Sequence, residues 1–458
     1  MPALRLATTL LLAATLAACS SVRPWINAPR SAATDLDSVA IAKRDSSALF
    51  VVTLSGGGAR AAAFGYGVLQ ELRDTPCCWS NRGGNVLDAV DLVSGVSGGS
   101  VVAAYFAAFG SDGLDAFEPD FLRQNFQEGL VGQLARPANL FDLTSPWFGR
   151  SQLLERRLDT LYRGMTFGDV ERRPRHPQLV VTATDMTLGT GFDFTADTFR
   201  LICSDLHSVP LSFAVTASSA VPLLLSPMTL RNFGGECPTG VANVGSTTAA
   251  HNTALENDYR ARLFEAQSRS YMEAAARPYI HLVDGGLADN LGVRRLVDVA
   301  LPGGGMDAAF SEVKVAPGSV HKLVLVVVNA ERDPERNIDA SDRVPGTTEV
   351  VDALLFGAGN RATVETQEFL ADIGRRFRED VKSGRRFSSF APDAELFLVL
   401  VNLRDAQGEA RRKLLQVPTA FTISNDEVTS LIAAGRSVLR ASSEFQALNR
   451  SMGLPAAP

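Results

Sequence analysis

The sequence lacks the features that mark several common classes of protein. Its net charge is only −6 and charged residues make up 21% of the chain, so no basic footprint for nucleic acid is present. None of the five cysteines stands in a C-x-x-C or Cys/His spacing, so no metal site is expected. The apolar stretch at Leu6–Ala18 is shorter than the ~20 residues of a membrane span.

Nucleotide-binding patterns are missing too, although a glycine-rich loop follows the first strand-like run. This loop ends in Gly58-Ala59-Arg60 instead of the G-K-[ST] of a phosphate-binding loop. Ala61 occupies the last position of the dinucleotide pattern G-x-G-x-x-G. We therefore expect no nucleotide and no other cofactor.

What is present is typical of a globular α/β protein. Hydrophobic residues make up 46% of the chain, and 458 residues suffice for one large or two moderate domains. Strands are expected at 48–54, 90–93, 178–185, 279–284, 322–329 and 396–403. Helices are expected at 61–72, 151–162, 211–221, 255–271, 350–382 and 426–446. This alternation predicts a mainly parallel sheet flanked by helices.

The N-terminus resembles that of a bacterial lipoprotein. Arg5 precedes the apolar run, which ends in Leu16-Ala17-Ala18-Cys19, a sequence similar to a lipobox. We expect residues 1–18 to be a signal peptide and Cys19 to be lipidated, with a plain secretory peptide as the alternative. Ser20, which is not aspartate, favours the outer membrane of a Gram-negative cell.

Three further segments are expected after the signal peptide. Residues 19–47 are polar with scattered prolines and are interpreted as a tether, a strand or helix attached to the body being the alternative. Residues 48–330 form the main domain, and 331–458 form an α/β extension packed on it. Among the other four cysteines, which allow three full pairings, Cys203–Cys237 is the favoured disulfide.

The chain contains a candidate nucleophile at Gly95-Val96-Ser97-Gly98-Gly99, which fits the G-x-S-x-G elbow. Such an elbow holds its serine on a sharp strand-to-helix turn, and Gly95 and Gly99 would relieve crowding there. An ordinary glycine-rich turn is the alternative. The helix that follows would direct its positive end at an oxyanion.

The loop at 55–60 is the candidate oxyanion hole. A strand, three glycines and a helix N-terminus together present several backbone N–H groups. We expect Gly56, Gly57 and Gly58 to supply these donors.

Asp284 is a better candidate base than any histidine. Of the five histidines, none lies in the loop just after a late strand, and His281 lies within a predicted strand. Asp284 follows that strand and precedes two glycines, although many Asp-Gly pairs merely open a turn.

Taken in order, these segments resemble the patatin-like phospholipase family. The resemblance rests on Ser55–Arg60, Gly95–Gly99, the block Ala217–Pro222 and Asp284-Gly285-Gly286, and Ala61 departs from the family's usual glycine. It implies a three-layer fold and a Ser97–Asp284 dyad that needs no metal. Arg60 would then steady the oxyanion loop or contact a lipid phosphate.

The resemblance also implies the reaction. The expected function is hydrolysis of acyl esters in phospholipids or related lipids, close to the membrane to which Cys19 would anchor the chain. A dry pocket around the base is expected from the apolar runs Ala103–Phe109 and Val221–Leu225. The alternatives are a catalytically silent lipid-binding lipoprotein and an acyltransferase.

Overall fold

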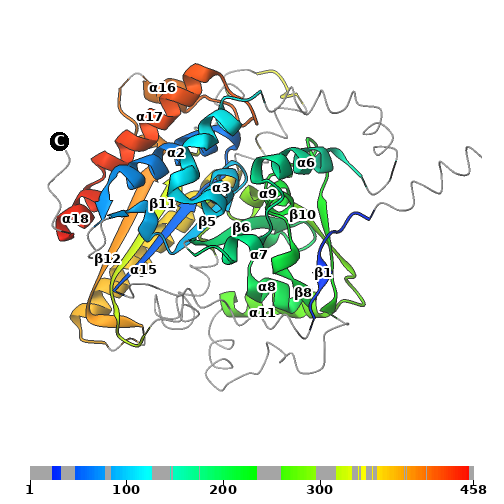
Figure 1. Ribbon diagram of the computed structural model, residues 1–458, viewed down its shortest axis with the longest axis horizontal. Helices are drawn as coiled ribbons and strands as arrows, with labels where there is room; N and C mark the ends of the chain where they lie inside the picture. The colour runs from blue at the N-terminus through cyan, green and yellow to red at the C-terminus, as the bar shows by residue number, and fades with distance from the viewer. Residues whose placement is uncertain are drawn as a thin grey trace, which may run out of the picture.

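The computed structural model describes most of the chain (Figure 1). The described residues are 23–31, 47–77, 84–125, 145, 148–174, 176–234, 259–294, 316–332, 339, 342–346, 353, 358–385, 387, 389–408 and 410–452. The predicted signal peptide, Cys19, Cys78 and Cys237 lie outside these ranges.

An eight-stranded sheet forms the centre of the molecule, in the order β12-β11-β2-β5-β6-β10-β9, with β7 paired to β6. Its strands are β2 (Ala48–Leu54), β5 (Leu92–Val96), β6 (Gln178–Asp185), β7 (Thr190–Asp193), β9 (Met228–Arg231), β10 (Tyr279–Val283), β11 (Val320–Asn329) and β12 (Phe390–Asn402). The strands from β12 to β6 run parallel, whereas β10 is antiparallel to both β6 and β9. The fold is the predicted mainly parallel α/β architecture.

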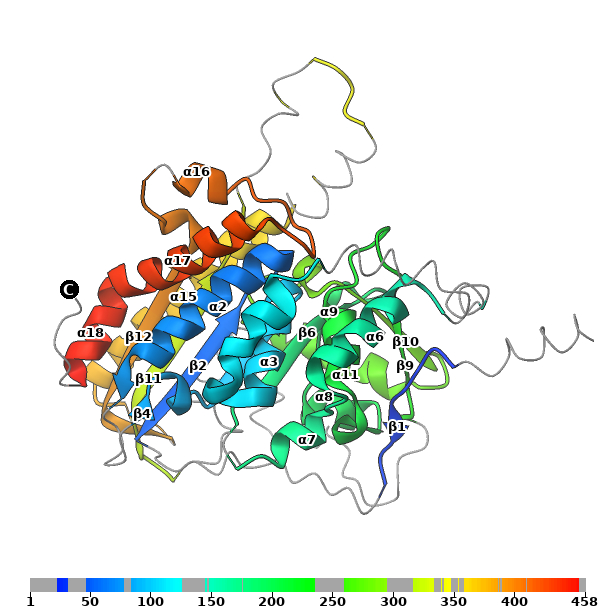
Figure 2. The ribbon, with the colours of Figure 1, turned by 45° about the horizontal axis from the view of Figure 1, so that its top comes forward.

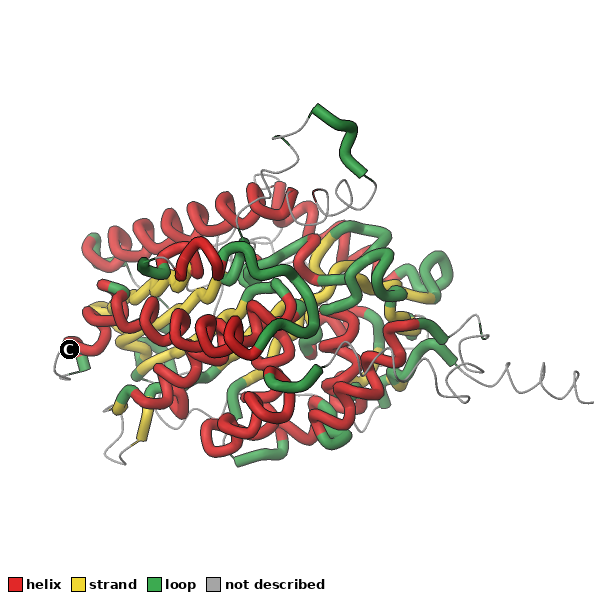
Figure 3. Tube along the Cα trace, turned by 90° about the horizontal axis from the view of Figure 1, so that it is seen from above, coloured by secondary structure: helices red, strands yellow, loops and turns green. Residues whose placement is uncertain are grey.

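The main helices are α2 (Gly58–Asp74), α3 (Gly98–Gly113), α6 (Arg150–Tyr162), α9 (Leu211–Ser218), α11 (Tyr259–Met272), α15 (Ala358–Lys382), α17 (Asn425–Ala441) and α18 (Ser443–Ser451). Shorter helices are α7 (Phe167–Glu171), α8 (Ala196–Leu201) and α16 (Ala410–Leu414). Seen from above, the strands lie between helices on both faces (Figure 3). None of the described helices combines the length and hydropathy that a bilayer span requires.

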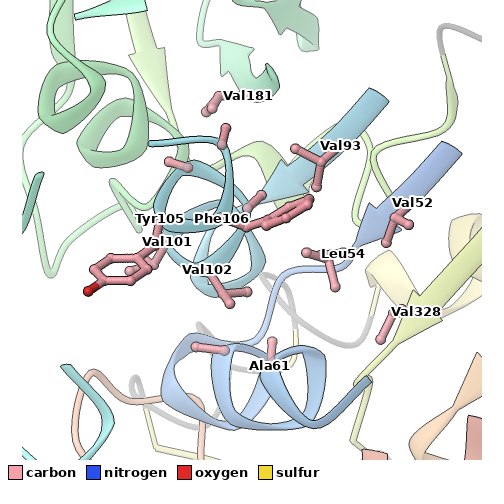
Figure 4. Close-up of a cluster of buried hydrophobic side chains, with 14 of the residues drawn as sticks. Val52, Leu54, Ala61, Val93, Val101, Val102, Tyr105, Phe106, Val181 and Val328 are labelled. Atoms are coloured by element: carbon pink, nitrogen blue, oxygen red, sulfur yellow. The ribbon is translucent and has the colours of Figure 1, made fainter. Parts of the chain in front are cut away.

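Alternation along the central strands explains why both faces of the sheet are covered. In β2, Phe50, Val52 and Leu54 belong to the core that also contains side chains of α2 and α3. Figure 4 shows Val52 and Leu54 in this core. Leu49 and Val51 pack on the opposite face, in the core that also contains side chains of α15. A strand buried on both faces reads as a continuous apolar run, and this is why the sequence predicts β2 correctly.

The sequence missed the short strands β7 and β9, extended the helix at 211–221 three residues beyond the end of α9, and joined two closing helices into one. β9 is only four residues long and follows a proline-containing turn, so it offers little periodicity. The predicted closing helix at 426–446 is two helices, since Ser442 is extended and caps α18 through its side chain.

The prediction of a tether over 19–47 is wrong for the part that the structure describes. Strand β1 (Ala28–Pro29) pairs with β8 (Ser204–Asp205) in an antiparallel ladder. The buried Asn27 side chain donates to the Arg231 carbonyl oxygen (2.8 Å) and accepts from the Arg231 N–H (3.0 Å). These bonds join residues far apart in the sequence, so no local pattern could have predicted them.

The C-terminal region completes the sheet instead of standing apart from it. β12 pairs with β11 at Phe390 and from Glu395 to Asn402, and α17 lies along α2 (Figure 2). The helices approach closely, because a Cβ added at Gly435 would lie 2.2 Å from the Phe64 carbonyl oxygen. Cys203 is disulfide-bonded, and the predicted pairing with Cys237 falls on a residue outside the described ranges.

Candidate active site

The elbow predicted at residues 95–99 is a sharp turn between β5 and α3. Ser97 sits at the turn with φ 47° and ψ −122°, a backbone conformation that non-glycine residues rarely adopt. Strain of this kind is found where a side chain must be presented for function. The Ser97 N–H donates to Ser218 Oγ at 2.8 Å, and this bond helps to hold the turn.

Glycine is required in this elbow because backbone segments cross it. A Cβ added at Gly99 would lie 2.4 Å from the carbonyl oxygens of Leu54 and Ser55, and one added at Gly95 would lie 2.5 Å from Ser100 Cα. Gly99 therefore lets the end of β2 approach the start of α3, and Gly95 lets β5 pack against the same helix.

Asp284 accepts a hydrogen bond from the candidate nucleophile. The Ser97 Oγ–H donates to Asp284 Oδ2 at 2.8 Å, across 187 residues of sequence. Asp284 Oδ1 accepts the Gly286 N–H at 2.8 Å, and the Asp284 N–H donates to the Ala220 carbonyl oxygen at 3.0 Å. The carboxylate is thus oriented with one oxygen toward Ser97.

Burial changes the acidity of this carboxyl group. Desolvation raises the pKa of Asp284 to about 6, against the lowering effect of the hydrogen bonds from Gly286 and Ser97. A carboxylate with a pKa nearer to neutrality is a stronger base than one in water, yet it is still ionised at pH 7.

Among the three glycines expected to supply oxyanion donors, the structure contradicts Gly56 and leaves the N–H groups of Gly57 and Gly58 available. The Gly56 N–H donates to the Asn290 carbonyl oxygen at 3.0 Å, so it is not available to an oxyanion. The N–H groups of Gly57, Gly58 and Gly98 have no acceptor among the described residues. The Gly58 carbonyl lies against Gly98 Cα, which brings the loop and the elbow together.

Arg60 steadies this loop and is too buried to reach a lipid phosphate. Only 2% of its surface is exposed. Its Nε donates to the Ala330 carbonyl oxygen at 2.9 Å, Nη1 donates to the Val417 carbonyl oxygen, and Nη2 donates to Thr419 Oγ1. Of the two predicted roles for Arg60, the structural one fits the structure.

Two polar residues near the dyad were not predicted as site residues. Ser218 donates to the Thr182 carbonyl oxygen at 2.6 Å while it accepts the Ser97 N–H, so it joins the elbow to β6. The Asn290 Oδ1 lies against Gly56, since a Cβ added there would be 2.6 Å away. Ser218 belongs to the small-residue block Ala217–Pro222, and this block was the sequence signal that could have identified it. Asn290 follows Asp284 by six residues, and this spacing does not indicate any particular chemistry.

Other groups considered from the sequence lie elsewhere. His281 contacts Thr229 Oγ1 and His321 contacts Asp393, while His207 pairs with Glu171. Within the described part of the chain, no group of three or more histidine, cysteine or acidic side chains is arranged to hold a metal ion.

The two apolar runs expected to form a pocket around the base differ in burial. Ala103–Ala108 is buried in α3, whereas its role in a pocket around the base stays a prediction. Leu223 and Leu224 are instead 69% and 64% exposed, although Leu225 is buried. The turn at 221–225 therefore does not surround the base with apolar side chains.

Comparisons with known proteins place this geometry in a family. The patatin-like phospholipase family matches residues 52–297. Human GIVD cytosolic phospholipase A2 has a TM-score of 0.44 and 11% identity over 89% of this chain, which spans 63% of the length of the human chain. VipD from Legionella pneumophila has a TM-score of 0.29 and 12% identity, over 84% of this chain and 67% of its own.

No curated protein matches the sequence significantly. The family match covers more than half of the chain and includes the glycine loop, the elbow and Asp284. The protein belongs to the patatin-like phospholipase family.

Proposed function

We propose that the protein is a serine lipid acyl hydrolase in which Ser97 is the nucleophile and Asp284 the general base. The observation that carries this proposal is the 2.8 Å hydrogen bond from Ser97 Oγ to Asp284 Oδ2 at a strained elbow. Family membership supports activity on lipid acyl esters in general.

The first half of the reaction transfers the acyl group to Ser97. Asp284 takes the Ser97 hydroxyl proton as Oγ attacks the ester carbonyl carbon, and the carbonyl oxygen becomes an oxyanion. The unoccupied N–H groups of Gly57, Gly58 and Gly98 are the available donors to it. Collapse of this intermediate expels the alcohol, which receives the proton from Asp284 and leaves an acyl group on Ser97.

Water completes the cycle. Asp284 takes a proton from a water molecule, whose oxygen attacks the acyl carbonyl carbon. The second tetrahedral intermediate then releases the carboxylic acid and returns the proton to Ser97 Oγ. The chemistry uses only groups of this chain and water.

Ser97→Ala and Asp284→Asn test the dyad. We expect each substitution to lower kcat on a soluble ester by at least about 10³-fold, the order of magnitude lost when a nucleophile or its base is removed. Ser437→Ala and Asp393→Asn are matched controls away from the site and should leave kcat unchanged. Full activity in either dyad variant would disprove the proposed mechanism.

Three assays identify the substrate and separate the hydrolase from its alternatives. A fluorophosphonate probe should label the wild type and fail to label Ser97→Ala, whereas a silent lipid-binding protein would not be labelled at all. Lipid-class profiling with wild type and Ser97→Ala side by side identifies the substrate. Products formed with and without an added alcohol or lysolipid distinguish transfer to water from transfer to another acceptor.

We also propose that Cys19 is lipidated and anchors the chain in the outer membrane. The support is the lipobox-like Leu16–Cys19 sequence followed by Ser20. Metabolic labelling with a fatty-acid analogue should label the wild type and not Cys19→Ser. Recovery of unlabelled wild type in the soluble periplasmic fraction would contradict the anchor.

A further inference from the structure

Leu223 and Leu224 form an exposed apolar projection at the edge of the candidate site. Isolated exposed leucines are common and need no explanation. Here two consecutive leucines are 69% and 64% exposed on a five-residue turn, residues 221–225, between α9 and β9. We call this segment the leucine turn.

The leucine turn is held in a conformation that leucine rarely adopts. Leu223 has φ 70°, in the left-handed region. The Arg150 Nη2 donates to the Leu223 carbonyl oxygen at 2.7 Å, and the Ser151 N–H donates to Ser226 Oγ at 3.2 Å. The first residues of α6 therefore hold the middle of the turn and the residue that follows it, so hydrogen bonds support the backbone that carries the exposed leucines.

This turn is directly connected to the candidate base. The Ala220 carbonyl oxygen, one residue before the turn, accepts the Asp284 N–H at 3.0 Å. Leu287, which follows Asp284 by three residues in the sequence, is also exposed, at 41%. Exposed apolar side chains thus flank the segment that carries the base.

A positive charge accompanies the leucines. Arg150 is exposed and forms no ion pair with any residue in the part of the chain that the structure describes. Its hydrogen bond to Leu223 uses one nitrogen and leaves other guanidinium N–H groups for an acceptor. Apolar side chains beside a free cation match a phospholipid surface, with acyl chains below and phosphates at the headgroup level.

We propose that the leucine turn and Arg150 form the surface that docks on an anionic phospholipid bilayer, with Leu223 and Leu224 inserted among the acyl chains. The proposal rests on the proposed function, because a lipid acyl hydrolase must bring its site to the bilayer that holds its substrate. Docking here would place the segment beside Asp284 at the lipid surface.

The test compares vesicles with a soluble ester, using the full chain with Cys19→Ser so that no acyl anchor masks weak docking. The variant is Leu223→Asn with Leu224→Gln, because asparagine tolerates the left-handed backbone at position 223. Leu263→Gln is the matched control, an exposed leucine (63%) on α11. Vesicles contain phosphatidylglycerol and phosphatidylcholine in equal parts.

We expect the double variant to keep its rate on a soluble short-chain ester within about twofold of the parent. Its hydrolysis of vesicle lipid should fall by at least about tenfold, the factor that corresponds to ~1.4 kcal/mol of lost leucine burial. Co-sedimentation with the same vesicles, in the Ser97→Ala background, should fall equally. Leu263→Gln should behave like the parent in all three assays.

Arg150 is tested by changing the lipid. Arg150→Gln should remove the preference for vesicles that contain phosphatidylglycerol over pure phosphatidylcholine, and Arg150→Lys should retain it. The preference of the parent should also weaken as salt is added.

The outcomes separate docking from catalysis. Unchanged vesicle binding and hydrolysis in the double variant would overturn the docking surface, and so would equal losses on vesicles and on the soluble ester. Loss of self-association with vesicle binding intact would assign the turn to a contact between copies. Failure of the proposed function is a different result, namely full activity of Ser97→Ala on the soluble ester.

Discussion

At the scale of single residues, the candidate site depends on one buried carboxylate. Desolvation raises the pKa of Asp284, and the hydrogen bonds from Gly286 and Ser97 oppose this rise. No basic side chain contributes to the shift. Burial therefore moves its pKa toward neutrality, and in the proposed mechanism its protonation state controls the reaction.

The first prediction concerns the pH dependence of kcat/KM. Asp284 must be ionised to accept the Ser97 proton, and its pKa is about 6. We expect kcat/KM on a soluble ester to fall about tenfold per pH unit below pH ~6. Circular dichroism over the same range controls for unfolding, since burial also raises the pKa of Asp289 to about 6. A flat profile between pH 4.5 and ~7 would contradict the role of Asp284.

The second prediction concerns stability. A carboxyl whose pKa rises from 3.8 to about 6 on folding binds more protons when folded, so its contribution to stability is lost as pH rises through this window. Asp284→Asn should therefore be more stable than the wild type above pH ~6, by an amount on the order of 1–3 kcal/mol. The advantage should vanish below pH ~4. Urea unfolding at both pH values measures it.

At the scale of elements, the start of α2 is held by a segment far along the chain. The Ala59 N–H donates to the Ala420 carbonyl oxygen at 2.7 Å, and Arg60 contacts Val417, Thr419 and the end of β11. These bonds occupy Ala59 and Arg60 while the N–H groups of Gly57 and Gly58 stay unoccupied. The C-terminal region thus shapes the candidate oxyanion hole.

Substituting Arg60 is the third prediction. Arg60→Met would leave the buried acceptors unpaired, which we expect to cost about 3 kcal/mol of stability and to lower kcat. Arg60→Lys should not rescue either property, because one ammonium group cannot span the positions of three guanidinium nitrogens. Arg361→Lys, at an arginine whose side chain is 89% exposed, is the control. Thermal unfolding and ester assays provide the measurements; full rescue by lysine would show that charge alone suffices.

At the scale of the whole molecule, helices that are far apart in the sequence share one core. α2 and α17 are separated by more than 350 residues of sequence, yet glycines let their backbones touch. Glu71 on α2 adds a bidentate pair with Arg440, at 2.8 Å for each bond. The C-terminal helices are therefore part of the layer that carries the glycine loop.

The fourth prediction tests this contact. Gly435→Ala should destabilise the protein by about 1–3 kcal/mol, because its Cβ would lie 2.2 Å from the Phe64 carbonyl oxygen. Gly84→Ala is the control, since its Cβ would meet nothing within 4 Å. Chemical denaturation should show one transition in the wild type, in Gly435→Ala and in Gly84→Ala. A stable Gly435→Ala variant would mean that the helices separate without cost.

The sequence alone determined the class of fold and the two candidate reacting residues. Buried parallel strands such as β2 and β11 are continuous apolar runs, and the elbow at Ser97 and the Asp284-Gly285-Gly286 box are local patterns. Each of these signals lies within a few residues, where propensity and sterics act. The central strands and the family assignment are confirmed, whereas the catalytic roles stay predictions.

Only the tertiary structure decided how these parts combine. It brought Ser97 to Asp284, used the Gly56 N–H for Asn290, buried Arg60, and attached residues 28–29 to β8. It also exposed Leu223 and Leu224, although the apolar sequence around them predicts that they are buried. Hydrogen-bond partners and burial depend on which distant segments meet, and that information is not contained in any short stretch of sequence.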